Sequence, residues 1–198
     1  PLQRQFEGRL LCYEGDVRSE SSVAQAVRAA AGAFGGLDAA VQNACLCPFS
    51  PFEDTDSGVL KAAFYVNYFG AVNLTRSAAP HMRAGGRILF TSSGVGVTGF
   101  PNLTAYASTK GAIESLAKCL RLEYARQGLS FHILHPPLTR TRSSAPLPVP
   151  AEFMASPEAV GRGLAKRLFS RHFIICHSPW QRAQTLMCYL APLKFGSL

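Results

Sequence analysis

Residues 87–135 read RILFTSSGVGVTGFPNLTAYASTKGAIESLAKCLRLEYARQGLSFHILH. The runs at 87–90 and 130–134 have the length and apolar character of short buried strands. Between them, apolar residues recur at helical spacing over 104–127, and Gly128 is placed to end that helix. A strand, a helix and a second strand in this order predict two parallel strands joined by a crossover helix.

The same alternation continues on both sides of this stretch. Further strands are predicted at 9–14, 37–41 and 173–176, and further helices at 19–34, at 55–82 and from Ser156 onward. A bend is expected near Pro80, because proline lacks an amide donor and clashes with the preceding turn. No linker divides the chain, so residues 1–198 are predicted to form a single α/β domain, a parallel sheet covered by helices on both faces.

Composition narrows the class of protein. The chain has 198 residues, 47% of them hydrophobic and 16% charged, which is typical of soluble globular proteins. No apolar run reaches the roughly 18 residues that a membrane helix needs, and no signal peptide is visible, so a cytoplasmic location is expected. The segment 180–195 (WQRAQTLMCYLAPLKF) could lie on a membrane, although a core-packing or dimer-contact helix is the commoner explanation.

The net charge of +8 comes from scattered basic residues with one modest cluster at 162–172. Nucleic-acid binding is not expected, because no basic stripe with interleaved aromatic residues is present. A solvated basic face, turned towards an anionic cofactor or a membrane surface, is the preferred interpretation.

The cysteines and histidines do not predict a metal site. The six cysteines show neither a C-x-x-C pair nor zinc-ligand spacing, so reduced and mostly buried thiols are expected. His132 and His135 have H-x-x-H spacing, but on a strand these positions point to opposite faces.

The stretch GVGVTG at 94–99 matches the G-x-G-x-x-G pattern of dinucleotide-binding turns. Such a turn should lead directly into a helix whose N-terminus holds the pyrophosphate. Here Phe100, Pro101 and Asn102 intervene before the helix begins near Thr104. The pattern is therefore a poor fit, and we expect a flexible loop beside the substrate instead.

Tyr106 and Lys110 are the more promising pair. At positions i and i+4 of a helix they lie on one face, and a nearby ammonium would lower the tyrosine pKa towards a value useful for acid–base chemistry. Ser93, at a strand end, could hold a substrate oxygen while Tyr106 exchanges a proton with it. When a Y-x-x-x-K sequence occurs alone, its tyrosine and lysine are more often ordinary residues of an exposed helix surface than catalytic residues.

Three features together make the chain resemble the short-chain dehydrogenase/reductase family over nearly all of its length. Ser93 precedes Tyr106 by 13 residues, Y-x-x-x-K runs from Tyr106 to Lys110, and Asn67 lies in YVNYFG. The resemblance implies a doubly wound, Rossmann-like parallel sheet with Tyr106 as catalytic acid/base and Ser93 orienting the carbonyl or alcohol. It also implies that Lys110 binds the nicotinamide ribose and depresses the tyrosine pKa, and that Asn67 holds a water in the proton relay.

The resemblance further implies NAD or NADP as cofactor, since no side chain can supply a hydride. The cofactor-binding residues that it implies are Asp16 and Val17 near the adenine, Asn43, Ala44 and Cys45 in the family's N-N-A-G turn, Tyr106 and Lys110, and Pro136, Thr139 and Thr141 in its P-G-x-x-x-T segment. Two departures matter, because Cys45 and Pro137 stand where the family has glycine.

The family's glycine-rich T-G-x-x-x-G-x-G turn would precede Pro1, together with its first β-α-β unit. We therefore expect a piece of a longer protein, a fold lacking that unit, and poor cofactor binding by the 198-residue chain alone. The choice between NAD and NADP would be set by residues before Pro1.

The expected function is NAD(P)(H)-dependent interconversion of a small-molecule ketone and a secondary alcohol, in a homodimer or homotetramer. The proline-rich, apolar segment after Thr141 makes an apolar or lipid-like substrate plausible. The alternative is a catalytically silent relative that acts as a binding or scaffold protein, or an inactive fragment. Substitution of Tyr106 by Phe separates the two.

Overall fold

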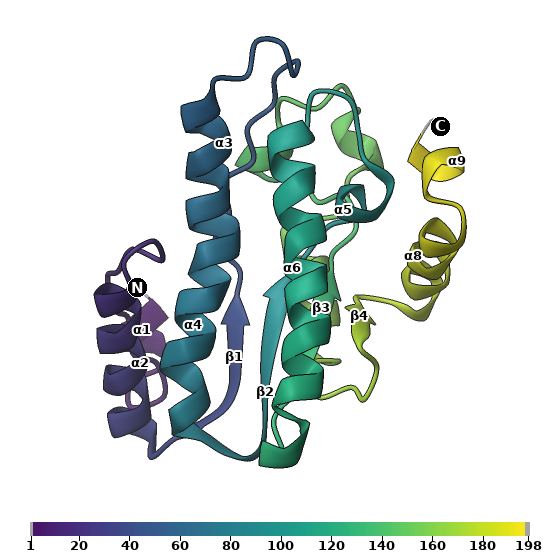
Figure 1. The fold of residues 1–198 in the computed structure, drawn as a ribbon. Helices are drawn as coiled ribbons and strands as arrows, with labels where there is room; N and C mark the ends of the chain where they lie inside the picture. The colour runs from purple at the N-terminus through teal and green to yellow at the C-terminus, as the bar shows by residue number, and fades with distance from the viewer. Residues whose placement is uncertain (1, 197–198) are drawn as a thin grey trace.

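The computed structural model describes residues 2–196 and contains one four-stranded parallel sheet (Figure 1). The strands follow one another in the order β1 (Leu37–Gln42), β2 (Met82–Thr91), β3 (Ser130–His135) and β4 (Ile174–Cys176). Every neighbouring pair is parallel. The predicted fold class, an α/β parallel sheet with flanking helices, is thereby confirmed.

One face of the sheet is covered by α2 (Glu20–Phe34), α4 (Gly70–Ala78) and α6 (Thr104–Glu123), which lie side by side in Figure 1. Alternate strand residues point at these helices: Ile88 and Phe90 of β2 and Phe131 and Ile133 of β3 are fully buried. The helices contribute Val23, Val27, Ala71, Ala78, Ile113 and Ala117 to the same core. This burial of apolar surface fixes α6 against the sheet.

The opposite face carries a smaller core. Leu89, Leu134 and Ile175 pack there against Leu164 of α7 (Pro157–Ala165) and against Leu168. After β4 the chain continues into α8 (Pro179–Leu190) and α9 (Pro192–Gly196), which stand beside the sheet in Figure 1. The remaining short elements are α1 (Leu2–Gln5), α5 (Val95–Thr98) and four 3₁₀ turns at Ala79–His81, Ala125–Gln127, Arg142–Ser144 and Ala151–Phe153.

Several helix ends lie where the sequence predicts them. Ser19 caps α2 by accepting from the Ser22 amide, and Ser156 caps α7 by accepting from the Ala159 amide. Gly128 adopts a left-handed conformation, with φ of 72°, just after the 3₁₀ turn that follows α6. Polar N-caps and left-handed glycines satisfy backbone groups that have no partner inside the helix.

The helix predicted over 55–82 is interrupted earlier than expected. It comprises α3 (Ser57–Phe64), a π-helical turn (Tyr65–Phe69), and α4, followed by the 3₁₀ turn that contains Pro80. A π turn holds one more residue than an α turn. No residue type marks a π turn in a sequence as clearly as proline marks a helix bend, so this turn could not be predicted. The main irregularity is therefore the π turn, which contains Asn67.

The strand predicted at 9–14 is wrong. Residues 10–16 have no regular secondary structure, and β1 forms that edge of the sheet. A strand needs hydrogen-bonding neighbours, and none of the described strands pairs with this segment.

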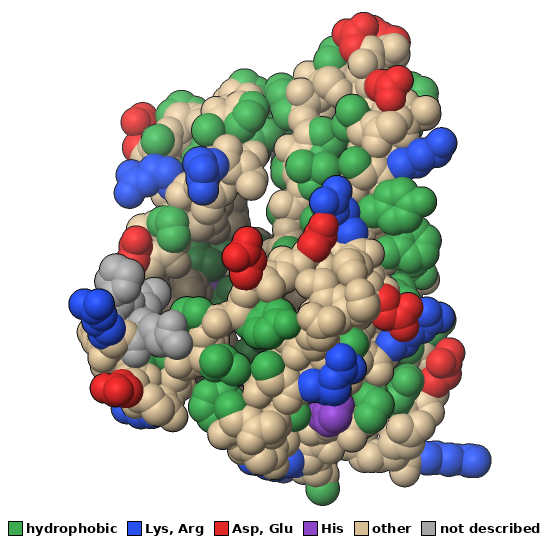
Figure 2. Space-filling view, turned by 90° about the vertical axis from the view of Figure 1, so that its left-hand side faces the viewer, with side chains coloured by type: hydrophobic (Ala, Val, Ile, Leu, Met, Phe, Trp, Pro, Cys, Tyr) green, Lys and Arg blue, Asp and Glu red, His purple; other side chains and the backbone are tan. Residues whose placement is uncertain are grey.

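Charged side chains of both signs lie on the surface of the molecule (Figure 2). On the face shown in Figure 2, basic and acidic side chains are interspersed rather than gathered in a stripe.

The expectation of mostly buried thiols is wrong, because Cys12, Cys45 and Cys119 are exposed and only Cys176 is buried. Among residues 2–196, no helix combines the length and apolar character needed to cross a membrane.

Candidate active site

A cavity of about 780 Å³ opens at the carboxyl ends of β2 and β3. Ser93, Tyr106 and Lys110 all line it. Its walls are largely apolar and include Val95, Leu103, Leu138, Val149, Val160, Leu164 and Phe195. The ends of parallel strands are where ligands bind in such sheets, so this cavity is the candidate active site.

Lys110 lies at the base of the cavity with a side chain only 1% exposed. Its Nζ donates to the Thr91 carbonyl at 2.7 Å and lies 5.3 Å from the centroid of the Tyr106 ring. Burial lowers the pKa of Lys110, while the thiols of Cys45 and Cys47 raise it. A buried ammonium with three donors and this one carbonyl acceptor is well placed to bind hydroxyl groups in the cavity.

The pKa of Tyr106 is raised, not lowered as the sequence alone suggests. Burial is the main cause, the nearby thiols of Cys45 and Cys47 add to it, and interaction with the Ser93 side chain acts in the opposite direction. The expected lowering by Lys110 fails because removal of the phenol from water disfavours the phenolate. Tyr106 is therefore a protonated phenol at neutral pH, ready to donate.

Asn67 is buried but does not line the cavity. Its side chain makes three hydrogen bonds: it accepts from the Leu46 amide at 2.8 Å, and it donates to the Leu46 carbonyl at 2.9 Å and to Thr109 Oγ1 at 2.8 Å. Asn67 thus ties the segment after β1 to α6. Its role in holding a water stays a prediction.

The segment after β1 brings two of its three predicted residues to the cavity. Asn43 and Cys45 line it, and Ala44 does not. Asn43 Oδ1 accepts from Thr91 Oγ1 at 3.0 Å. Burial and the neighbouring Cys45 raise the pKa of Cys47 to about 11, against an opposing effect of Lys110, so this thiol is not a ready nucleophile near neutral pH.

The segment after β3 contributes the predicted residues Pro136, Thr139 and Thr141, together with Pro137. Thr139 Oγ1 donates to the Pro137 carbonyl at 2.7 Å, and the Thr141 amide donates to Ser144 Oγ at 2.9 Å. These bonds hold the segment in a fixed loop along the cavity wall.

Asp16 and Val17 lie outside the cavity. The Asp16 carboxylate is paired with Arg18, with a shortest contact of 2.7 Å, and hydrogen bonds from Arg18 lower its pKa. Val17 packs close to Gly70 at the start of α4, and its carbonyl accepts from Asn73 Nδ2 at 3.0 Å. The structure therefore does not bring the predicted adenine-side residues together with Tyr106.

The glycine-rich stretch is not the flexible loop that the sequence suggests, because residues 95–98 form α5. A Cβ on Gly96 would lie 2.7 Å from the Cβ of Lys110 and 3.0 Å from the Gly111 amide nitrogen. Gly96 is thus required by the close packing of α5 on α6.

A buried polar cluster beneath the cavity was not predicted from the sequence. Glu114 of α6 binds Ser92, His135 and Tyr189, which come from three other segments of the chain. A signal was available: Glu114 follows Lys110 by four residues and therefore shares its helix face. The contributions of α8 and of Phe195 to the cavity were also missed.

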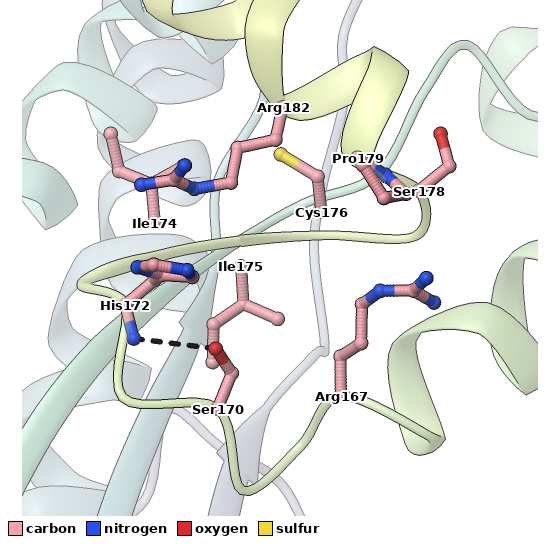
Figure 3. Close-up of a pocket in the computed structure, with 9 residues that line it drawn as sticks. All are labelled: Arg167, Ser170, His172, Ile174, Ile175, Cys176, Ser178, Pro179 and Arg182. Atoms are coloured by element: carbon pink, nitrogen blue, oxygen red, sulfur yellow. Dashed lines mark hydrogen bonds between the residues drawn. The ribbon is translucent and has the colours of Figure 1, made fainter.

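A second cavity of about 310 Å³ lies beside β4 and shares no lining residue with the first. Figure 3 shows that the guanidinium groups of its two arginines, Arg167 and Arg182, lie apart, on either side of Ile175. Arg167 Nη1 is already bonded to the His177 carbonyl at 2.7 Å. Because these cations do not converge, the first cavity is the better candidate.

The chain matches known proteins over most of its length. A family described as short chain dehydrogenase matches residues 1–149. The chain is 36% identical over 136 residues to Oxidoreductase UcpA of Escherichia coli (strain K12), which takes in 67% of this chain and 52% of that protein. The chain therefore spans about half the length of this curated relative.

Solved structures of short-chain dehydrogenases are also similar to this chain. A short-chain dehydrogenase from Streptomyces avermitilis is 30% identical, with a TM-score of 0.66, over 71% of this chain and 53% of that one. A short chain dehydrogenase from Burkholderia cenocepacia J2315, solved in complex with NADP, is 28% identical, with a TM-score of 0.65, over 70% of this chain and 57% of that one.

Proposed function

Since the chain belongs to the short-chain dehydrogenase family, we propose that the whole protein is an NAD(P)(H)-dependent oxidoreductase that interconverts a ketone and a secondary alcohol. The observation that carries this proposal is the convergence of Ser93, Tyr106 and Lys110 on one cavity at the carboxyl end of the sheet.

The residues present fit the nicotinamide end of such a cofactor. Lys110 Nζ makes a hydrogen bond to Thr91, and two further donors remain for ribose hydroxyls. Thr139 and Thr141 of the cavity wall, with Asn43 opposite, offer further polar atoms. When bound, the cofactor would supply or accept the hydride.

The side chains would manage the proton. Tyr106, held protonated by burial, donates its phenolic hydrogen to the ketone oxygen as negative charge develops there. Ser93 hydrogen-bonds the same oxygen and orients it. In the opposite direction a Tyr106 phenolate must accept a proton from the alcohol, and the Lys110 ammonium, 5.3 Å from the ring centroid, would offset part of the cost of burying that charge.

The walls of the cavity favour an apolar substrate. Leu103, Leu138, Val149 and Val160 supply apolar surface, although polar side chains of α8 such as Gln181 and Gln184 line the cavity as well. An apolar part of a substrate would leave water on contact with the first group, which is favourable. We propose a ketone or alcohol on an apolar or lipid-like skeleton.

The test is the Tyr106→Phe variant of the whole protein, assayed with NADH and with NADPH on a panel of apolar ketones. We expect carbonyl reduction to fall by about 10²–10⁴-fold. The matched control is Tyr124→Phe, directly after the end of the same helix, where the ring packs on Phe131 and does not line the cavity. Unchanged reduction by Tyr106→Phe would refute the mechanism.

The alternative, a silent binding or scaffold protein, rests on Cys45 and Pro137, which replace family glycines beside the proposed cofactor. It predicts that the unaltered protein reduces no ketone with either cofactor, and a parent protein with such activity excludes it.

A further inference from the structure

Helix α8 buries polar side chains and exposes apolar ones, which is the reverse of an ordinary surface helix. Its two buried side chains, Gln181 and Thr185, are polar. Its apolar side chains face solvent: Trp180, Met187 and Leu190 are 74%, 51% and 85% exposed. Surface helices normally dock by burying an apolar stripe. Apolar burial therefore does little to hold α8 in place.

Hydrogen bonds hold it instead, at both ends. In its first turn, Gln181 Nε2 donates to the His135 carbonyl at 2.7 Å. Near its last turn, the Tyr189 hydroxyl donates to Glu114 Oε2 at 2.6 Å and lies 3.1 Å from His135 Nε2. Of these two partners, His135 lines the cavity, and Glu114 lies beneath it.

Glu114 is the centre of this network. Its Oε1 accepts from Ser92 Oγ at 2.8 Å and lies 2.9 Å from His135 Nε2, while Oε2 takes the Tyr189 hydroxyl. Glu114 and His135 are 4% and 1% exposed. A carboxylate so far from water must keep these partners, because an unsatisfied buried charge is costly.

The position of α8 determines the shape of the catalytic cavity. Gln181, Gln184, Thr185 and Cys188 of α8 line the same cavity as Tyr106. A shift of α8 would therefore move one whole wall, while Tyr106 and Lys110 on α6 would stay fixed by their own core.

We propose that Glu114 is a positioning residue that fixes α8, through Tyr189 and His135, as the specificity-determining wall of the substrate cavity. The part of this inference that concerns substrate rests on the proposed function, and the part that concerns α8 does not. Glu114 acts on how substrate is held and not on the proton transfer itself.

The experiment compares Glu114→Gln and Tyr189→Phe with the unaltered whole protein. The control is Glu123→Gln, an exposed position at the end of the same helix. The first readout is the rate at which a thiol reagent labels Cys188, measured by peptide mass spectrometry relative to exposed Cys119 of α6. The second is KM against kcat for an apolar ketone.

For Glu114→Gln we expect Cys188 labelling to rise by about tenfold and KM by a similar factor, with kcat within about twofold, as loss of a charged hydrogen bond allows. Tyr189→Phe should shift both quantities in the same direction by less, because only one hydroxyl is removed. It also carries the test if Glu114→Gln fails to fold. The control should match the parent.

Two results would overturn the proposal. A fall in kcat with unchanged KM and unchanged Cys188 labelling would place Glu114 in the chemistry, through Lys110. Unchanged labelling in Tyr189→Phe would mean that α8 is held in another way. If the parent protein reduces no ketone, the labelling rates still decide whether Glu114 docks α8, and only the proposed function fails.

Discussion

Helices α6 and α8 form two walls of one cavity and are held in place by different kinds of interaction. Helix α6 buries Ile113 and Ala117 completely against the sheet, whereas α8 buries Gln181 and Thr185. Apolar burial is non-directional and large, while hydrogen bonds are directional and modest in net energy. Tyr106 and Lys110 therefore stand on a helix with apolar support, and the wall that α8 forms can be altered separately.

The largest expected effect comes from breaking the apolar support of α6. Ile113→Ala should lower the free energy of unfolding by about 2–5 kcal/mol, because it leaves a cavity in a fully buried core. Leu122→Ala, at an exposed position of the same helix, should change it by less than about 0.5 kcal/mol. Denaturant titration of both variants measures the difference, and equal losses would contradict it.

A smaller loss is expected where α5 meets α6. Gly96→Ala places a methyl group against Lys110 and should cost about 1–3 kcal/mol in unfolding free energy, because the packing leaves no room for it. Gly94→Ala is the matched control, since a Cβ there meets nothing within 4 Å. If the two variants melted alike, the contact between the helices would not be as close as described.

The hydrogen bonds that hold α8 should make the free energy of unfolding depend on pH in the acidic range, through Glu114. Burial raises the pKa of Glu114, but hydrogen bonds and charge from His135, with Tyr189 and Ser92, outweigh it and lower the pKa below its ordinary value of 4.5. The contribution to stability is therefore fully present above pH 4.5 and is lost as pH falls through the lower folded value.

Unfolding free energies measured from pH 6 downward check this dependence in the parent and in Glu114→Gln. The parent should lose more stability than the variant below about pH 4.5, since only the parent must protonate this carboxylate. Parallel curves would mean that the Glu114 carboxylate is not stabilised by its partners.

The smallest effect is expected on the outer side of α8. Met187→Ser should leave the unfolding free energy within about 0.5 kcal/mol of the parent, because this half-exposed side chain does not dock the helix. A loss of several times that size would show that apolar burial holds α8 after all, and would remove the contrast with α6.

Local features of the fold could be predicted, and features that depend on distant neighbours could not. The run from Thr104 to Gly128 carries its own helical periodicity and stop, so α6 could be located from the sequence. The segment 9–14 has strand composition but no partner beside it. The spacing of Tyr106 and Lys110 placed both in one cavity, yet burial, which the sequence does not give, reversed the expected pKa shift.

Helix α8 shows the same limit. The apolar residues of 180–195 suggest a core-packing helix, but Trp180 and Leu190 face outward within the described chain. Polar residues such as Gln181 and Tyr189 give no sign in the sequence that they face inward, because their partners lie 46 and 75 residues away. The membrane and dimer-contact alternatives for this segment stay predictions.

The π-helical turn at Tyr65–Phe69 constrains how this chain can change over evolutionary time. Because a π turn holds one more residue than an α turn, deletion of one residue here would leave an ordinary α turn and keep α3 and α4 in register. Deletion of one residue within α4 would instead turn the residues after it by roughly 100°, and Ala78 would swing away from the sheet. Related chains should therefore differ in the length of this helix at the π turn and not within α4.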